Sequence, residues 1–272
     1  MDALSSGGLR RELSARNLAR AVDHEHEMTY GEVASVIYRG DEGAHGNFYA
    51  ASYRAICARP EWARRLEKSY TASARVPRSQ DRRRYELDCA NSSDALLMNI
   101  FCCPRVLHRA EVCGLLGVDH GLVPEFGVRV GIPLQKGIDR TEVDMCLGDL
   151  LVEAKLTETG FQTAPVRLLL RYSALAEVFD VDTLQRSGNG CVRGYQLIRG
   201  ALAAYSKGCS FAVLCDGRRR DLVEEWFGVM RAVRSLSFQS RLKLLTWQEL
   251  AGTLPRALQR FLEEKYGIVA SR

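Results

Sequence analysis

The chain has 272 residues, of which 46% are hydrophobic and 26% charged. This composition is typical of a globular protein with one sizeable core, or one core and a smaller subdomain. Its 38 Lys and Arg residues outnumber its 33 Asp and Glu residues, and the net charge of +5 permits nucleic-acid binding without demonstrating it. No run approaches the roughly 20 apolar residues of a membrane span, and no long apolar signal segment is seen, so we expect no membrane insertion.

The cysteines argue against two kinds of site. The chain contains nine of them, and none forms a C-x-x-C pair, so neither a zinc ribbon nor a redox motif is expected. Cys209 and Cys215 flank an apolar run and are interpreted as buried free thiols. Free thiols are typical of a reducing compartment, and we therefore expect a cytoplasmic protein.

The first 90 residues predict a mainly helical region. The expected elements are a polar, Arg-rich helix within residues 1–20, a short strand near 32–38, and a helix at 48–68. Residues 70–90 are polar and contain Pro77 and a triple arginine, and they predict a linker or surface loop. We therefore divide the chain into an N-terminal region, residues 1–90, and a core, residues 91–272.

The core predicts an α/β fold. Ser92 or Ser93 can cap a helix that Pro104 interrupts after Cys103. The stretch 157–190 is expected to be an insertion that could contact a substrate. The other expected elements are strands at 126–132, 141–147 and 150–156, a helix at 192–205, a buried strand at 209–215, a helix at 221–233, a strand at 242–246 and a helix at 255–266.

The strands 141–147 and 150–156 predict a β-hairpin with a defined register. Both alternate apolar and polar residues, and Gly148-Asp149 suits a two-residue turn with Gly at its first central position. This turn places Leu147 opposite Leu150 and sets the remaining pairs. They are Met145 with Val152, Asp144 with Glu153, and Glu142 with Lys155.

One face of this hairpin would be charged. Directly opposed like charges are destabilising, so folding alone gives no reason for Asp144 to face Glu153. A divalent metal between them would, because Mg²⁺ prefers hard oxygen ligands. Lys155 lies on the same face as Glu153 and can orient a water molecule or stabilise developing charge. These residues point to metal-assisted phosphodiester hydrolysis.

Asp144, eight intervening residues and then Glu153-Ala154-Lys155 resemble the D…ExK signature of the PD-(D/E)xK nuclease superfamily. The proline common before the aspartate is replaced by Val143, at a position that varies in the superfamily. The resemblance implies a restriction-endonuclease-like αβββαβ core with a mixed central sheet flanked by helices. It also implies Mg²⁺ or Mn²⁺ held by Asp144 and Glu153, with the Ala154 carbonyl as a further ligand.

A second resemblance spans most of the chain. The segments 45–48, 91–101, 245–247 and 265–267 look like those of a largely uncharacterised bacterial family of putative restriction endonucleases. This resemblance says little about the substrate.

Further site residues are expected around this centre. The position of Gln196 on the helix after the ExK strand resembles that of a glutamine which supports the active site in RecB-like enzymes. The third acidic group that superfamily members often have would be Glu142, Glu111 or Glu125. Arginine runs at 82–84 and 218–220 are interpreted as solvated faces or phosphate contacts. The candidate nucleic-acid-binding residues are Arg82, Arg83, Arg84 and Arg199.

We therefore expect a metal-dependent nuclease that cuts DNA, and an endonuclease in particular, with residues 1–90 as a candidate DNA-contacting extension. A homodimer is expected by analogy with restriction enzymes. Three alternatives stay open at this point. The chain could be a non-catalytic DNA-binding or assembly protein with a nuclease-like fold, an RNA-directed nuclease, or a protein whose acidic hairpin face is fortuitous.

Overall fold

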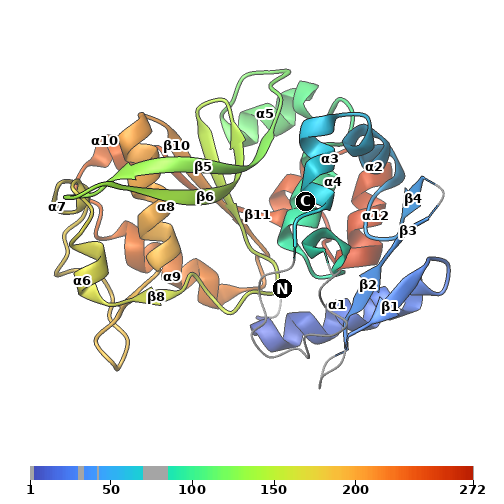
Figure 1. The fold of residues 1–272 in the computed structure, drawn as a ribbon, viewed down its shortest axis with the longest axis horizontal. Helices are drawn as coiled ribbons and strands as arrows, with labels where there is room; N and C mark the ends of the chain where they lie inside the picture. The colour runs from blue at the N-terminus through green and yellow to red at the C-terminus, as the bar shows by residue number, and fades with distance from the viewer. Residues whose placement is uncertain (1–2, 30–33, 42, 70–84, 272) are drawn as a thin grey trace. The chain divides into compact units, whose positions relative to one another are not determined.

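A computed structural model describes residues 3–29, 34–41, 43–69 and 85–271 (Figure 1). The chain forms two compact units, one made of Met1–Ser5 and Phe126–Thr246 and the other of Ser6–Glu125 and Trp247–Arg272. These units do not follow the boundary near residue 90, which remains a prediction about how the chain divides in function.

The first unit is built on a five-stranded sheet. Its strands lie in the order β11 (Leu242–Thr246), β10 (Ser210–Cys215), β7 (Leu150–Ala154), β6 (Ile138–Leu147) and β5 (Glu125–Pro133). The sheet is mixed, because β10 runs parallel to both of its neighbours while β6 and β7 are antiparallel. The predicted α/β fold with a mixed central sheet is confirmed.

The hairpin between β6 and β7 has the predicted turn. Leu147 pairs with Leu150, so Gly148 and Asp149 are the two turn residues. Gly148 has a φ of 57°, a left-handed conformation that favours glycine at the first central position of such a turn. The predicted pairs Leu147–Leu150 and Met145–Val152 are confirmed, but the pairing ends at Met145–Val152, so the predicted pairs Asp144–Glu153 and Glu142–Lys155 are not part of it.

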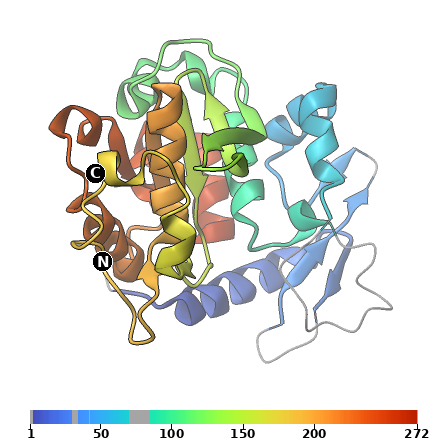
Figure 2. The ribbon, with the colours of Figure 1, turned by 60° about the vertical axis from the view of Figure 1, so that its left-hand side comes forward.

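The helices of this unit cover the sheet. Helix α8 (Tyr195–Lys207) packs against β6, β7 and β10, as Figure 2 shows. The remaining elements are β8 (Thr163–Ala164), α6 (Val166–Leu169), α7 (Leu175–Val178), β9 (Val192–Arg193), α9 (Arg220–Met230) and α10 (Leu236–Gln239). The stretch expected to be an insertion, residues 157–190, thus contains β8, α6 and α7.

The predicted start of the 192–205 helix is wrong. Val192–Arg193 instead form β9, which pairs antiparallel with β8. Gly194 has a φ of 74°, outside the right-handed helical region, and the helix begins at Tyr195. A pairing with residues some thirty positions earlier in the chain overrides the local helical pattern.

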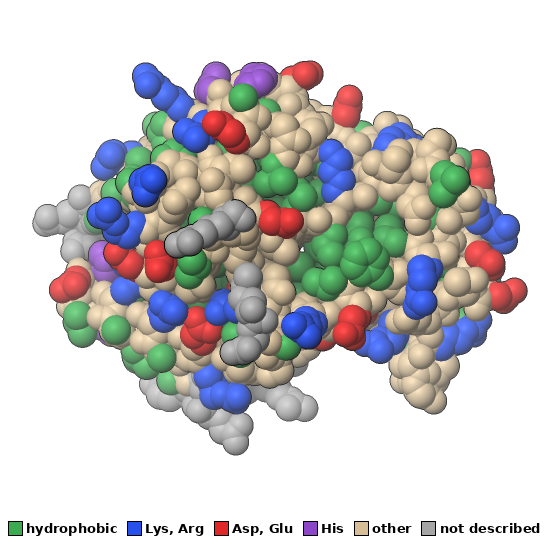
Figure 3. Space-filling view, turned by 180° about the vertical axis from the view of Figure 1, so that it is seen from behind, with side chains coloured by type: hydrophobic (Ala, Val, Ile, Leu, Met, Phe, Trp, Pro, Cys, Tyr) green, Lys and Arg blue, Asp and Glu red, His purple; other side chains and the backbone are tan. Residues whose placement is uncertain are grey.

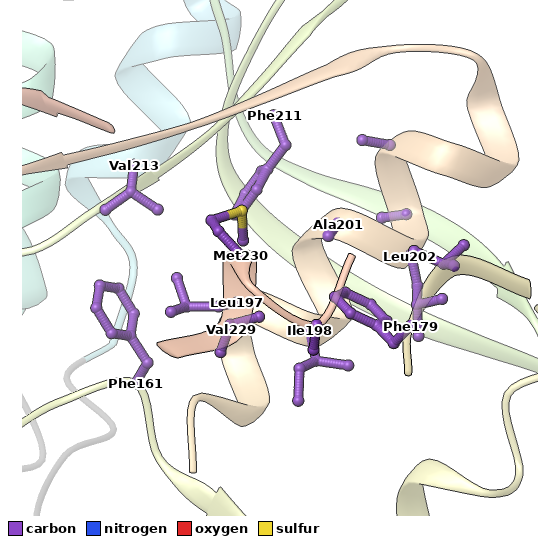
Figure 4. Close-up of a cluster of buried hydrophobic side chains, with 14 of the residues drawn as sticks. Phe161, Phe179, Leu197, Ile198, Ala201, Leu202, Phe211, Val213, Val229 and Met230 are labelled. Carbon is purple, nitrogen blue, oxygen red and sulfur yellow. The ribbon is translucent and has the colours of Figure 1, made fainter. Parts of the chain in front are cut away.

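The core of the first unit lies between α8 and the sheet (Figure 4). Leu197, Ile198, Ala201 and Leu202 of α8 are fully buried, as is Phe211 of β10. The closest approach of helix and strand is at Gly200, where a Cβ would lie 2.4 Å from the Cζ of Phe211. The helix can therefore approach the sheet this closely only with glycine at position 200.

Gly200→Ala is expected to lower the free energy of unfolding by roughly 1–3 kcal/mol, because the added methyl group overpacks the contact with Phe211. Gly114→Ala, in a helix where a Cβ meets nothing within 4 Å, should instead be neutral or stabilise by up to about 1 kcal/mol. Urea denaturation midpoints of the two variants measure the difference. Equal midpoints would contradict the packing described for α8.

The second unit is mainly helical. The expected 48–68 helix is two helices, because Pro60 holds the preceding Arg59 in an extended conformation. Ser92 caps α4 by accepting the Ala95 N–H. No helix in the described ranges is both long and apolar enough to cross a membrane. The helices are α1 (Ser6–Ala21), α2 (Ala50–Cys57), α3 (Pro60–Leu66), α4 (Ser93–Phe101), α5 (Ala110–Leu116), α11 (Trp247–Thr253) and α12 (Arg256–Tyr266), and the short strands are β1 (His26–Met28), β2 (Val36–Tyr38), β3 (Gly40–Asp41) and β4 (Ala44–His45).

Residues of the second resemblance form a buried polar network in this unit. The ring of His45 contacts Asp88 at 3.2 Å. Asn99 donates to the Asn47 carbonyl at 3.0 Å. Lys265 is fully buried and donates to a side-chain oxygen of Asn17 at 2.5 Å. In the structure these positions hold the second unit together.

Candidate active site

Asp144 lies on the half-buried side of β6, next to the pair formed by Met145 and Val152. Its carboxylate accepts a hydrogen bond from the backbone N–H of Ala154, with a donor–acceptor distance of 2.7 Å. The Asp144 side chain is therefore fixed to β7 beside the ExK residues. This hydrogen bond requires only an oxygen acceptor on Asp144. The position of the Ala154 N–H on β7 therefore determines where the carboxylate lies.

Glu153 and Lys155 form a buried ion pair at the end of β7. Their exposed fractions are 8% and 5%, and the Lys155 Nζ lies 2.5 Å from a carboxylate oxygen of Glu153. The backbone N–H of Lys155 donates to the Leu214 carbonyl at 2.8 Å, so the pairing with β10 holds the lysine in place. The predicted neighbourhood of these two side chains is thus present.

Two further carboxylates act on Lys155. Burial by itself would lower its pKa, but the charges of Glu153, Glu158 and Asp144 outweigh burial and raise the pKa. The Asp144 and Glu153 carboxylates therefore both lie near the same ammonium group. Asp144, Glu153 and Glu158 thus all act on the Lys155 ammonium group.

Glu158 is a residue that the sequence reasoning missed. It is half-buried and accepts the backbone N–H of Leu156 at 2.6 Å, which folds the chain back toward β7. The ring of Phe161 lies 5.7 Å from the Lys155 Nζ on the same turn of chain. The sequence does show an acidic residue, Glu158, three positions after Lys155. It was not considered for the site because it lies in residues 157–190, which were interpreted as an insertion.

Arg219 holds this turn and was also missed. It is fully buried and donates to the carbonyls of Leu156 and Glu158 at 3.3 and 2.9 Å, and it pairs with Asp221 at 2.8 Å. The interpretation of residues 218–220 as a solvated or phosphate-contacting run is therefore wrong for its middle residue. Only the long-range fold separates it from its exposed neighbour Arg220.

Arg219→Ala is expected to lower the free energy of unfolding by roughly 2–4 kcal/mol, because two buried carbonyl groups lose a charged donor and a cavity remains. Arg220→Ala is the matched control and should change it by less than about 0.5 kcal/mol, since Arg220 is exposed. Urea denaturation measures both. A comparable effect of the two substitutions would sink the assignment of Arg219 as the residue that holds the turn.

Gln196 lies near this group through its backbone. Its N–H donates to the Phe161 carbonyl at 2.9 Å. The first turn of α8 is thereby bound to the residue whose ring lies near the Lys155 ammonium group. The side chain of Gln196 is half-buried. Its proposed role in supporting the site stays a prediction.

The other predicted site residues lie elsewhere or remain untested. Arg199 packs over the ring of Tyr195 at 5.3 Å and lines a separate pocket. Glu142 is half-buried on β6, while Glu125 is exposed and Glu111 is exposed and pairs with Arg109 at 3.7 Å. Within the described parts of the chain, no three His, Cys, Asp or Glu side chains are grouped so as to hold a metal. The third acid stays a prediction.

The predicted phosphate contacts at Arg82, Arg83 and Arg84 lie outside the described residues. Among the coloured side chains of Figure 3, Lys and Arg are interspersed with Asp and Glu and form no single basic stripe on that face. Positive charge is therefore not concentrated on the face that Figure 3 shows. An anion would bind where a few basic side chains lie close together.

The donor set at the candidate site fits a hard divalent cation. Asp144 and Glu153 offer carboxylate oxygens, and the Ala154 carbonyl follows Glu153 directly in sequence. The charges of these carboxylates act on the Lys155 ammonium group, and the same oxygens would attract a divalent cation. Mg²⁺ commonly takes one or two carboxylates and keeps several waters, so two are sufficient.

Comparison with known proteins shows a family match over most of the chain. The model of a family described as Restriction Endonuclease associating with ARP matches residues 16–267, a range that contains every residue of the candidate site. No curated protein and no solved structure matches the chain.

Proposed function

The chain belongs to the family Restriction Endonuclease associating with ARP, and from this premise we propose that it is a metal-dependent nuclease that hydrolyses phosphodiester bonds in DNA. The observation that carries the proposal is the group formed by Asp144, Glu153 and Lys155 at the end of the hairpin. Endonucleolytic cutting is the activity that the family description favours. We place this activity in the cytoplasm, and the family description also supports association with the ARP partner that it names.

Asp144 and Glu153 would hold Mg²⁺ or Mn²⁺ through their carboxylates, with the Ala154 carbonyl as a further ligand. When bound, such a cation lowers the pKa of a water molecule and neutralises charge on the phosphate. Lys155 is a fixed cation two residues from Glu153, suited to orient the attacking water and to stabilise charge that develops on the phosphate.

The surrounding residues keep this lysine in place. Glu158 supplies a second negative neighbour, and Arg219 fixes the backbone that follows Lys155 through the carbonyls of Leu156 and Glu158. Gln196 is the side chain that we propose for support from α8. Charges that are already in position need little rearrangement during the reaction. Residues held at the end of β7 can accelerate hydrolysis in this way.

Incubation of the protein with supercoiled plasmid, linear duplex DNA and single-stranded RNA tests the proposal. With Mg²⁺ or Mn²⁺, the plasmid should become nicked and linear, and EDTA should prevent this. Binding without cutting would favour a non-catalytic DNA-binding protein, and cleavage of RNA alone would favour an RNA-directed nuclease. Cleavage that persists in EDTA would place the chemistry elsewhere.

A further inference from the structure

One pocket of the first unit is lined by several positively charged side chains. It has a volume of about 470 Å³, within the range of small-molecule sites. Arginines from three different segments line it, together with two tyrosines, one aspartate and three aliphatic residues. These lining residues are Arg140, Arg171, Arg199, Tyr172, Tyr195, Asp139, Leu134, Ile138 and Leu168.

The arginines of this pocket pair with no acid that the structure describes. Within the described parts of the chain, Arg140, Arg171 and Arg199 take part in no ion pair, and the guanidinium of Arg199 rests on the ring of Tyr195. Asp139, the one acid in the lining, already accepts the hydroxyl of Tyr172 at 2.6 Å. The pocket therefore has an excess of positive charge that suits an anion.

The pocket wall combines hydrogen-bonded tyrosines with exposed aliphatic side chains. Tyr172 donates to Asp139, so the 3.0 Å contact between the two tyrosine hydroxyls leaves Tyr195 as the donor to Tyr172. Next to this hydrogen-bonded chain, Ile138 is 64% exposed and Leu168 is 36% exposed. Exposed aliphatic side chains beside unpaired arginines match a ligand with an apolar face and an anionic end. A nucleotide has both.

The pocket lies along the strand that carries Asp144. Arg140, Glu142 and Asp144 occupy alternate positions of β6, while Thr141 and Val143 between them are buried. Four residues of a strand span about 13 Å, and this equals roughly four nucleotide rises of a DNA strand. A strand with its phosphate at Asp144 could therefore reach Arg140 a few nucleotides away.

We infer that this pocket binds one nucleotide of the substrate strand, with its phosphate on Arg140, Arg171 and Arg199 and its base against the aliphatic residues and Tyr195. The inference rests on the proposed function for the identity of that strand. Taking a base out of its stack is unfavourable, and stacking or apolar contact with the protein offsets this cost. The pocket would thereby set where along a strand the enzyme engages.

Binding of a fluorescent single-stranded oligodeoxynucleotide in EDTA tests the inference without cleavage. The triple variant Arg140→Gln, Arg171→Gln, Arg199→Gln should bind more weakly, and its slope of log affinity against log salt should fall by about 0.7, as the loss of one phosphate contact on a single strand requires. The matched control removes the same charge from exposed arginines outside the pocket, as Arg186→Gln, Arg193→Gln, Arg231→Gln. This control should keep the wild-type slope.

A series of oligonucleotides with one abasic position each tests the base. One position should weaken wild-type binding roughly five- to a hundredfold, and the pocket variant should lose this dependence. Equal slopes for the two triple variants, or no sensitive abasic position, would overturn the inference. If the wild type cuts plasmid with Mg²⁺ in either of those cases, the proposed function stands and only the pocket assignment fails. If the wild type binds as expected but cuts nothing, the pocket assignment stands and the proposed function fails.

Discussion

Lys155→Ala is expected to reduce Mg²⁺-dependent plasmid cleavage by roughly a hundred- to a thousandfold, because the site loses its fixed cation. Both proposed metal ligands remain in this variant, so Mg²⁺ should still bind. Its affinity should be equal or higher, because the lysine no longer competes for the Glu153 carboxylate. Nicking rates and isothermal titration with Mg²⁺ measure the two properties separately. Lys207→Ala, at an exposed position of α8, controls for the loss of one positive charge and should cut at the wild-type rate.

The same substitution should destabilise the metal-free protein. Glu153 keeps only 11% of its side-chain surface and loses its partner at 2.5 Å, and removal of one member of a buried pair typically costs about 3–5 kcal/mol. Saturating Mg²⁺ should recover much of this loss without restoring cleavage. An unaltered metal-free melting temperature, or cleavage at the wild-type rate, would contradict the arrangement described for Lys155.

Asp144→Asn should also abolish cleavage, but by weakening the metal site. The amide oxygen can still accept the Ala154 N–H, so the hairpin should stay intact. Loss of a charged ligand should reduce Mg²⁺ affinity and slow cleavage by roughly a hundredfold or more. The substitution relieves repulsion between Asp144 and the neighbouring carboxylates but also removes an attraction to the Lys155 ammonium group, so the metal-free free energy of unfolding should change by less than about 1 kcal/mol.

Two comparison variants isolate these effects. Asp144→Ala leaves the Ala154 N–H without its acceptor and should be less stable than Asp144→Asn by about 1–3 kcal/mol. Asp149→Asn removes the same charge at the exposed hairpin turn and should leave cleavage and Mg²⁺ affinity unchanged. If Asp144→Asn bound Mg²⁺ with wild-type affinity, the assignment of Asp144 as a metal ligand would be lost.

Much of the hairpin could be predicted from sequence because local rules determine it. Alternation decides which side chains share a face, and Gly148 selects the turn that fixes the pairs. The central strand β10 was equally readable as a short apolar run between Gly208 and Asp216-Gly217, and the edge strand β11 was also predicted. These are the elements in which local pattern and tertiary contacts agree.

The remaining site residues depend on contacts that no local pattern contains. Arg219 reaches back 63 residues to the Leu156 carbonyl, and in sequence it looks like its exposed neighbour Arg220. Glu158 becomes part of the site only because the chain turns back after β7. The helix start at Tyr195 shifted for the same reason, through the pairing of β8 with β9. Long-range contacts, rather than propensity, decided each of these positions.

A crystal structure of the protein soaked with Mn²⁺ would test the central claim most directly, through the anomalous scattering of the ion. We expect an anomalous peak within coordination distance of carboxylate oxygens of both Asp144 and Glu153, at roughly 2.0–2.2 Å as for other small divalent ions at oxygen sites. The Lys155 Nζ should stay nearby without binding the metal. A peak at another group of residues, or none at these two carboxylates at saturating Mn²⁺, would contradict a metal-dependent active site at the end of this hairpin.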